Sequence, residues 1–323
     1  MRVLVVGAGV TGLTVGVTLA EAGFDVHLFA RELPLETTSA VAAALWYPYR
    51  VSPAERVLAW SARSLEVFTR LAGQEPECGV SLREGDELLT EPSEEPAWST
   101  LVTGFRRLAE FPAEYRDGWT FEAPVVEMSR YLRWLQRRLE TAGGTLTRMA
   151  FSALPDRADL VVNCSGLGAR GLSGDAGVSP VRGQVVRLAQ VGVERWLLDP
   201  NGLTYVVPRS QDIIVGGTDV VGEWDRRPDL AVAEQMLARA CQLVPALSSA
   251  AVLGHRVGLR PARDEVRLEA STSTGGRPLI HCYGHGGAGV TVSWGCGEEV
   301  LALAAQVLRG SPLPALASGP GGT

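Results

Sequence analysis

The sequence predicts an α/β fold in which a Rossmann-like parallel sheet is interleaved with a second domain built on a mostly antiparallel sheet. Residues 3–6 and 26–29 are short apolar runs, typical of strands buried on both faces, and a helical apolar period separates them. From Gly183 onward, alternating segments follow one another through short turns (GQVVRL, LTYVVP, DIIVGGT). Such segments are typical of antiparallel strands and indicate the second domain.

Three glycines in G-x-G-x-x-G spacing join the first strand to the helix. Gly7 permits the tight turn, Gly9 lets the backbone approach a pyrophosphate, and Gly12 lets helix and strand pack closely. The helix start also offers unpaired N–H groups and a positive dipole end. The spacing alone is a weak signal, but its place between a strand and a helix predicts a dinucleotide site made of Gly7, Ala8, Gly9, Val10, Thr11 and Gly12.

The end of the second strand leaves the identity of the dinucleotide open. Glu32 can bind the ribose hydroxyls, whereas Arg31 can face a 2′-phosphate, which would indicate NADP. In residues 37–50 (TTSAVAAALWYPYR), small residues allow close approach to a flat ligand, and the aromatic side chains provide walls. A helix start followed by a core cluster is the alternative interpretation. The aromatic residues concerned are Trp46, Tyr47 and Tyr49.

Composition excludes several classes of function. The chain has 323 residues, of which 46% are hydrophobic, enough for two domains or one cofactor domain with a large insertion. A formal net charge of −6 argues against nucleic acid or an anionic membrane as partners. No run approaches the roughly 18 consecutive apolar residues of a membrane span. Because the first strand begins at once, we expect no signal peptide and a cytoplasmic protein.

Five cysteines lack C-x-x-C spacing and four histidines are scattered, so we expect reduced thiols and no metal site. A Cys241–Cys282 disulfide is a remote alternative.

Amphipathic helices are predicted over residues 54–72, 129–141 and 231–244. The arginines of the second helix are expected on a solvated face. Strands are predicted over residues 146–151 and 160–163. Residues 73–125 lack the alternation of strands and helices of a β-α-β unit, so we interpret them as an inserted segment. We interpret the Pro/Gly-rich C-terminus as a tail.

The last part of the chain predicts a second strand, glycine-rich turn and helix, as at the N-terminus. Residues 279–283 predict a strand, glycines over residues 284–289 a turn, and a helix follows from about Thr291. Backbone N–H groups at such a turn can meet a second part of a cofactor. NAD enzymes of the Rossmann type rarely need this turn, whereas a flavin site with a pyrophosphate end and a ring end does.

In these blocks the chain resembles the FAD-dependent D-amino-acid oxidases, a family that includes D-aspartate oxidase. The similar blocks run in family order from residue 3 to about 308: VVGAGVTGL, LFAREL, TTSAVAAALWYPY, VVNCSGLG, RGQVV, TYVVP, GGT, VGLRP and HCYGHGGAGVT. The resemblance favours FAD at Arg31 and Glu32. It implies an FAD-binding domain of residues 1–50, 126–180 and 261–323 and a substrate-binding domain of residues 51–125 and 181–260.

The resemblance also implies roles for single residues. Arg260 would pair with the substrate α-carboxylate, as a planar guanidinium does through two parallel hydrogen bonds. Tyr205, otherwise an ordinary strand tyrosine, would bind the same carboxylate, and the carbonyl of Gly287 would accept the amino group. Leu45 and Tyr47 would line the substrate pocket. Besides the six residues of the first glycine loop, the implied cofactor contacts are Arg31, Glu32, Thr38, Ser39, Ala43, Ala44, Leu45, Ala150, Ser165, Gly166, Arg260, Gly286, Gly287, Ala288, Gly289 and Thr291.

Three departures from the family pattern bear on function. The stretch LLDPNGLTY places Asn201 where lid-bearing members carry a tyrosine, so we expect no lid. Ala44 replaces a glycine of the flavin loop. Asp219 stands where acid-preferring members carry an arginine, which predicts a preference for neutral or apolar D-amino acids. The alternative is that Asp219 caps a turn and faces water.

The implied reaction is oxidative deamination by hydride transfer from the substrate Cα to flavin N5, with O2 as acceptor. Its products would be a 2-oxo acid, ammonia and H2O2. The cofactor supplies the electronic chemistry, and the protein supplies orientation. The expected partners are D-amino acids and O2, and a homodimer is left open. The alternatives are a D-aspartate oxidase, an NADP-dependent reductase that uses Arg31, and a non-catalytic flavin protein.

Overall fold

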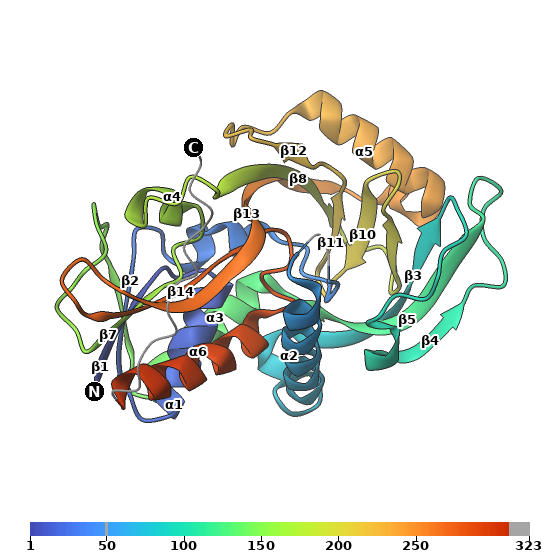
Figure 1. The fold of residues 1–323 in the computed structure, drawn as a ribbon. Helices are drawn as coiled ribbons and strands as arrows, with labels where there is room; N and C mark the ends of the chain where they lie inside the picture. The colour runs from blue at the N-terminus through green and yellow to red at the C-terminus, as the bar shows by residue number, and fades with distance from the viewer. Residues whose placement is uncertain (49–50, 310–323) are drawn as a thin grey trace, which may run out of the picture.

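A computed structural model describes residues 1–48 and 51–309, which form one mixed sheet with helices against it (Figure 1). Tyr49, expected as an aromatic wall, and the Pro/Gly-rich tail lie outside the described residues. All five cysteines lie inside them and are free. None of the described helices combines the length and apolarity that crossing a bilayer requires.

Within the described residues the strand order is β4-β5-β3-β9-β10-β11-β8-β13-β14-β7-β1-β2-β6, and β12 pairs with β8. The strands are β1 (Arg2–Val6), β2 (Asp25–Ala30), β3 (Val80–Leu89), β4 (Thr103–Arg107), β5 (Asp117–Val126), β6 (Thr145–Arg148), β7 (Leu160–Asn163), β8 (Ser179–Ala189), β9 (Trp196–Asp199), β10 (Thr204–Pro208), β11 (Asp212–Gly216), β12 (Val220–Val221), β13 (Val252–Thr272) and β14 (Pro278–His285). The α-helices are α1 (Val10–Glu21), α2 (Ala54–Gln74), α3 (Met128–Thr141), α4 (Ala169–Leu172), α5 (Leu230–Leu243) and α6 (Ser293–Leu308).

The predicted Rossmann-like part is the parallel ladder β14-β7-β1-β2-β6. Its central strands are continuously apolar because helices α1, α3 and α6 lie against the sheet (Figure 1). Helix α1 is buried along most of its length between the sheet and α6. A Cβ on Gly12 would lie 1.9 Å from the carbonyl oxygen of Gly7, so only glycine permits this approach of helix to loop. The predicted packing role of Gly12 is confirmed.

Several predicted boundaries need correction. The strand over residues 160–163 is confirmed, but the strand expected over residues 146–151 ends at Arg148. The reason is that β6 is an edge strand whose pairing partner β2 ends at Ala30, opposite Arg148. The ring of Phe151 instead packs edge-on against Phe29, with centroids 5.7 Å apart.

The arginines of α3 do not all lie on a solvated face. Arg130 and Arg133 are exposed as predicted. Arg138 instead lies over the rings of Trp134 and Trp294, at 5.0 and 5.3 Å from their centroids, and its Nε donates to Glu21 at 2.5 Å. Cation–π contact and an ion pair therefore use this arginine to join three helices.

Strand β13 connects the two halves of the sheet, because it pairs with β8 along one part and with β14 along another. Beyond β8 the strands β11, β10 and β9 are antiparallel, and α5 covers them with its apolar face (Figure 1). The proposed domain boundaries at 180/181 and 260/261 fall inside β8 and β13. The hydrogen-bonded sheet is thus continuous through both regions, and the two-domain division stays a prediction.

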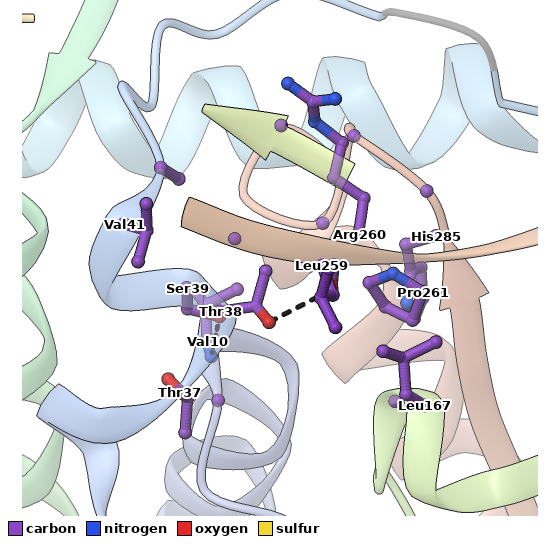
Figure 2. A pocket seen from close by; sticks show the side chains of 18 of the residues that line it. Val10, Thr37, Thr38, Ser39, Val41, Leu167, Leu259, Arg260, Pro261 and His285 are labelled. Atoms are coloured by element: carbon purple, nitrogen blue, oxygen red, sulfur yellow. Dashed lines mark hydrogen bonds between the residues drawn. The ribbon is translucent and has the colours of Figure 1, made fainter. Parts of the chain in front are cut away.

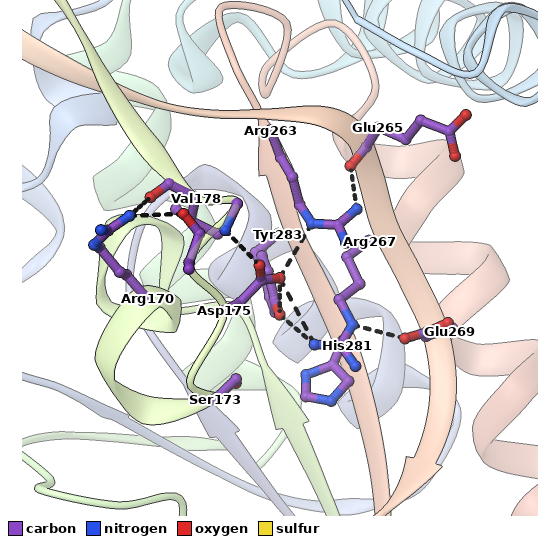
Figure 3. Close-up of polar contacts among 12 residues, drawn as sticks. Arg170, Ser173, Asp175, Val178, Arg263, Glu265, Arg267, Glu269, His281 and Tyr283 are labelled. Carbon is purple, nitrogen blue, oxygen red and sulfur yellow. Dashed lines mark hydrogen bonds and ion pairs between the residues drawn. The ribbon is translucent and has the colours of Figure 1, made fainter. Parts of the chain in front are cut away.

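A polar network fixes β13 and β14 to the segment that follows α4 (Figure 3). Asp175 Oδ2 accepts hydrogen bonds from Tyr283 at 2.9 Å and from Arg263 at 3.1 Å, and Arg267 donates to the Tyr283 hydroxyl at 2.7 Å. Burial lowers the pKa of the adjacent His281 to about 4, so its imidazole is neutral at pH 7. The network secures the strand that leads into the second glycine turn.

Ala44 lies where the chain enters the sheet in a conformation that favours glycine. Its φ is +59°, in the left-handed region, and its carbonyl accepts a hydrogen bond from Val126 N–H at 2.9 Å. An L-residue costs roughly 1–2 kcal/mol there. Alanine at this position therefore leaves backbone strain that glycine would not have.

We predict that Ala44→Gly raises the free energy of unfolding by up to about 1 kcal/mol, because relief of the strain exceeds the roughly 0.4–1 kcal/mol that glycine adds to unfolded-chain entropy. Urea unfolding of the cofactor-free protein measures this. Ala43→Gly is the matched control, since Ala43 has no positive φ, and it should destabilise. Equal destabilisation by both substitutions would contradict the argument.

Candidate active site

A cavity of about 790 Å³ runs from the start of α1 to strands β10 and β13. This volume is typical of sites for organic ligands. Of the residues expected to contact the cofactor or the substrate, all but Gly12 and Ala288 line it. The lining residues predicted from the sequence are Gly7, Ala8, Gly9, Val10, Thr11, Arg31, Glu32, Thr38, Ser39, Ala43, Ala44, Leu45, Tyr47, Ala150, Ser165, Gly166, Tyr205, Arg260, Gly286, Gly287, Gly289 and Thr291.

At one end the cavity meets the N-terminus of α1. Val10 N–H donates to Ser39 Oγ at 3.0 Å, and Thr38 Oγ1 donates to the carbonyl of Leu259 at 3.0 Å (Figure 2). The short helix that carries Thr38 and Ser39 is therefore tied both to α1 and to β13. A Cβ on Gly9 would lie only 3.1 Å from Ser39 Oγ, so the bare backbone of Gly9 keeps this end open. Backbone N–H groups and a helix start form the cradle that a pyrophosphate requires.

Gly7 and Ala288 act differently from one another. Gly7 has φ +115°, and a Cβ there would lie 2.3 Å from the carbonyl oxygen of Cys164, so the turn requires glycine. Ala288 is fully buried, and its N–H donates to the carbonyl of His285 at 3.0 Å. Like Gly12, Ala288 is part of a glycine loop but does not line the cavity.

Beside the ribose position, Glu32 has two arginine neighbours. Its Oε1 lies 3.4 Å from Arg31 Nη2 and 3.4 Å from Arg226 Nη1. Arg226 and Trp224 come from the segment between β12 and α5, and both line the cavity. Sequence reasoning missed them, because nothing in the local pattern shows that this distant segment returns to the end of β2.

At the other end, Arg260 of β13 and Tyr205 of β10 meet. Arg260 Nη1 donates to the carbonyl of Thr218 at 3.0 Å and lies 3.9 Å from Asp219 Oδ1. Burial raises the pKa of the Tyr205 phenol, and the adjacent Arg260 guanidinium opposes that rise. Figure 2 shows the Arg260 side chain rising from one side of β13 while Thr38 and Ser39 lie against the other. The pair can hold a carboxylate through several donors.

Two strand glycines, which sequence reasoning placed in strands without a role, make room for these side chains. A Cβ on Gly216, which pairs with Tyr205 across β11 and β10, would lie 2.0 Å from Tyr205 Cζ. A Cβ on Gly183 would lie 2.4 Å from Arg260 Nη2. The available signal was the glycine itself, since glycine inside a strand often marks close approach of another group.

Asp219 lines the cavity, and its side chain is 7% exposed, which contradicts the alternative that it faces water. Asn201, by contrast, is exposed and donates from its side-chain amide to Thr90 Oγ1 at 2.6 Å, outside the cavity lining. The loop of residues 200–203 that joins β9 and β10 is short. The expected absence of a lid stays a prediction.

Of the two described aromatic residues expected to form a wall of the site, Tyr47 lines the cavity and Trp46 does not. Tyr47 is held by two hydrogen bonds between its backbone and Thr291 Oγ1, at 3.1 and 3.0 Å, and its hydroxyl donates to Glu87 Oε1 at 2.5 Å. The prediction for Trp46 is wrong, because its side chain is fully buried in the core and donates to the carbonyl of Ser61 at 3.1 Å.

Glu87 titrates near neutral pH. Burial raises its pKa from 4.5 to about 7, and the hydrogen bond from Tyr47 partly opposes that shift. The folded state therefore holds this proton more tightly than the unfolded state. The contribution of Glu87 to stability is complete below about pH 4.5 and is lost as the pH rises to about 7.

We predict that Glu87→Gln removes this loss, because glutamine still accepts the Tyr47 hydroxyl and does not ionise. Relative to wild type, the variant should gain on the order of 3 kcal/mol between pH 5 and pH 8, at 1.36 kcal/mol per pKa unit. Urea unfolding at both pH values measures it. Glu84→Gln is the control, since arginines lower the pKa of that carboxyl. An unchanged pH dependence in Glu87→Gln would refute the assignment.

Comparison with known proteins agrees with this geometry. The profile of the FAD dependent oxidoreductase (DAO) family matches residues 2–303. The chain is 53% identical to a D-amino-acid oxidase of Rubrobacter xylanophilus, with 95% of this chain and 97% of the relative covered. It is 45% identical to a D-amino-acid oxidase of Streptomyces coelicolor, with 94% and 96% covered.

Solved structures share the fold. The crystal structure of glycine oxidase from Geobacillus kaustophilus superposes with a TM-score of 0.80 at 23% identity, covering 98% of this chain and 97% of that one. The glycine cradle at α1 fits the dinucleotide part of FAD, and the cavity is large enough to continue past it. The chain belongs to the family of FAD dependent oxidoreductases, and FAD is its cofactor.

Proposed function

We propose that this protein is a D-amino-acid oxidase that deaminates neutral or apolar D-amino acids to 2-oxo acids and ammonia, with O2 reduced to H2O2. The observation that carries the proposal is one continuous cavity with a glycine cradle at one end and the Arg260–Tyr205 pair at the other. The names of the two curated relatives support the same reaction.

The cofactor would be held along most of the cavity. Gly7 to Thr11 would receive its pyrophosphate, Glu32 its ribose, and the segments 43–45 and 286–289 its ring system. Thr38, Ser39, Ala150, Ser165, Gly166 and Thr291 would complete the contacts. When bound, FAD supplies the two-electron acceptor for the hydrogen at the substrate Cα.

The protein's own part is to bind and orient the substrate. The hydrogen bond to Thr218 and the space beside Gly183 fix the Arg260 guanidinium, so its remaining donors are directed before a carboxylate arrives. Tyr205 adds a hydroxyl donor, and the Gly287 carbonyl would accept an N–H of an uncharged amino group. Because a hydride leaves Cα with its electron pair, no side-chain base at Cα is needed. Correct placement thus accounts for most of the protein's contribution.

The visible spectrum under anaerobic conditions tests the proposal. Purified holoenzyme should be yellow and should bleach on addition of D-alanine or D-valine. A flavin that ignores every D-amino acid would instead indicate a non-catalytic flavin protein, and bleaching by D-aspartate alone would indicate a D-aspartate oxidase.

Gly9→Val should leave the chain folded and unable to retain FAD. A branched side chain would be forced against Ser39 and would hold the pyrophosphate away from the backbone. Flavin per chain, from absorbance after desalting, is the measurement. Gly73→Val is the control, because a Cβ at Gly73 has nothing within 4 Å. Full flavin occupancy in Gly9→Val would remove the basis for the cradle.

Arg260→Lys keeps the charge and loses the paired donors, so kcat/KM for D-alanine should fall roughly ten- to hundredfold, as expected for about 1.5–3 kcal/mol per hydrogen bond to a charged group. Arg260→Ala should lose more. Arg256→Lys, at an exposed position of the same strand, is the control. Steady-state kinetics at matched flavin content decide the matter, and near-wild-type efficiency in both Arg260 variants would end the carboxylate assignment.

Asp219 should disfavour a second carboxylate. Two unit charges about 4 Å apart interact by roughly 4 kcal/mol at an effective dielectric near 20, and a quarter of that changes efficiency about fivefold. We therefore expect Asp219→Asn to raise the D-aspartate to D-alanine ratio several-fold at low salt. The exposed Asp264→Asn controls for net charge. A wild type that prefers D-aspartate, or an unchanged ratio in Asp219→Asn, would contradict this explanation of specificity.

A further inference from the structure

Three buried side chains with metal-binding atoms converge behind the cavity wall. Cys282 and His285 belong to β14, and Cys296 belongs to α6. Their ligand atoms all lie within 4.8 Å of one another. His285 Nε2 is 3.9 Å from Cys282 Sγ and 3.7 Å from Cys296 Sγ. The scattered positions of these residues predict no metal site, but the fold brings them together.

Cys164 lies beside this group but is not part of it. It directly follows β7, the parallel neighbour of β14, and its sulfur is not among the ligand atoms that all lie within 4.8 Å of one another. Cys282 and His285 line the cavity, and Cys296 lies behind them with no exposed surface. The cluster therefore offers two sulfur atoms and one imidazole nitrogen, with access from the cavity side.

The spacing of the three ligand atoms allows one ion to contact all of them. Zn–S bonds of about 2.3 Å and Zn–N bonds of about 2.0–2.1 Å place neighbouring ligand atoms about 3.5–3.8 Å apart. The two measured sulfur–nitrogen distances, 3.7 and 3.9 Å, require only a small contraction. Thiolate and imidazole ligands select Zn²⁺ or Cu⁺ over harder cations.

Other buried thiols in this chain are placed differently. Cys78 packs into the core beside backbone groups, with its sulfur 4.0 Å from the Leu71 carbonyl and 3.4 Å from Val80 N. The sulfur atoms of Cys282 and Cys296 instead both face His285 Nε2. Two separate elements present these donors, and backbone hydrogen bonds hold them, such as Cys296 N–H to the carbonyl of Val292 at 2.9 Å.

We propose that Cys282, His285 and Cys296 bind one d¹⁰ cation, Zn²⁺ or Cu⁺, through two sulfur atoms and one imidazole nitrogen. None of these three side chains is assigned to substrate binding, so the role of the ion is structural. It joins α6 to β14 at the wall of the cofactor cavity. Binding displaces the thiol protons, so occupancy rises with pH.

The test uses the FAD-loaded enzyme, incubated anaerobically with a phosphine reductant and either Zn²⁺ or Cu⁺, and then desalted. Elemental analysis should find close to one metal ion per chain in at least one arm, and that arm identifies the cation. X-ray absorption at the metal edge should show mostly sulfur ligands. Cys282→Ala and Cys296→Ala should each lower retention about tenfold, whereas Cys241→Ala, in α5 and outside the cluster, should keep it.

Retention of neither cation by the wild type, or retention unchanged in both cluster variants, would overturn the proposal. If the variants fail to fold, the wild-type absorption spectrum decides alone, because only oxygen or nitrogen ligands around the metal would also overturn it. None of these measurements uses D-amino acid turnover, so failure here is distinguishable from failure of the proposed oxidase activity.

Discussion

The pairing of β13 with two neighbours is the constraint on which the rest of the site depends. Arg260 pairs with Val181 of β8, and two residues later Ala262 pairs both with Ser179 of β8 and with His285 of β14. The strand that carries Arg260 is thus in register with the strand that enters the second glycine turn. A slip of one residue would turn Arg260 to the other face of the sheet. One hydrogen-bonded ladder would therefore set both the proposed substrate position and the proposed position of the flavin ring.

The same ladder explains how a charged side chain can be kept largely out of solvent. The Arg260 side chain is 21% exposed, and a poorly solvated guanidinium is costly unless its donors are satisfied. Thr218 accepts one of its hydrogen bonds, Asp219 provides a nearby negative charge, and Gly183 leaves the space it fills. The polar network of Asp175 and Tyr283 fixes β14 beside it. These contacts stabilise a binding geometry that exists before the substrate arrives.

Sequence reasoning succeeded where the signal is local. The glycine spacing and continuous apolar run of the first β-α-β unit reflect short-range constraints. The resemblance also named Arg260 and Tyr205, which the fold brings together at the cavity, and their substrate-binding role stays a prediction. It failed where the contact partner is distant. Nothing near Glu87 shows that Tyr47 will bury it, and nothing near Arg226 shows that it will reach Glu32. Trp46 and Tyr47 look equivalent in sequence, yet the bridge of Leu45 to Val125 sends one ring to the core and the other to the cavity.

The pair of Arg260 and Asp219 connects affinity with selectivity. At 3.9 Å the two charges interact without a short hydrogen bond, so Asp219 offsets the guanidinium charge and leaves donors of Arg260 for a substrate carboxylate. A substrate carboxylate held by Arg260, as proposed, would lie close to the Asp219 carboxylate, and the paired hydrogen bonds of the guanidinium would offset that repulsion. A second carboxylate on the same substrate would have no such pair of hydrogen bonds from Arg260. The contact that stabilises Arg260 in the fold is therefore also the basis of the proposed preference for neutral D-amino acids.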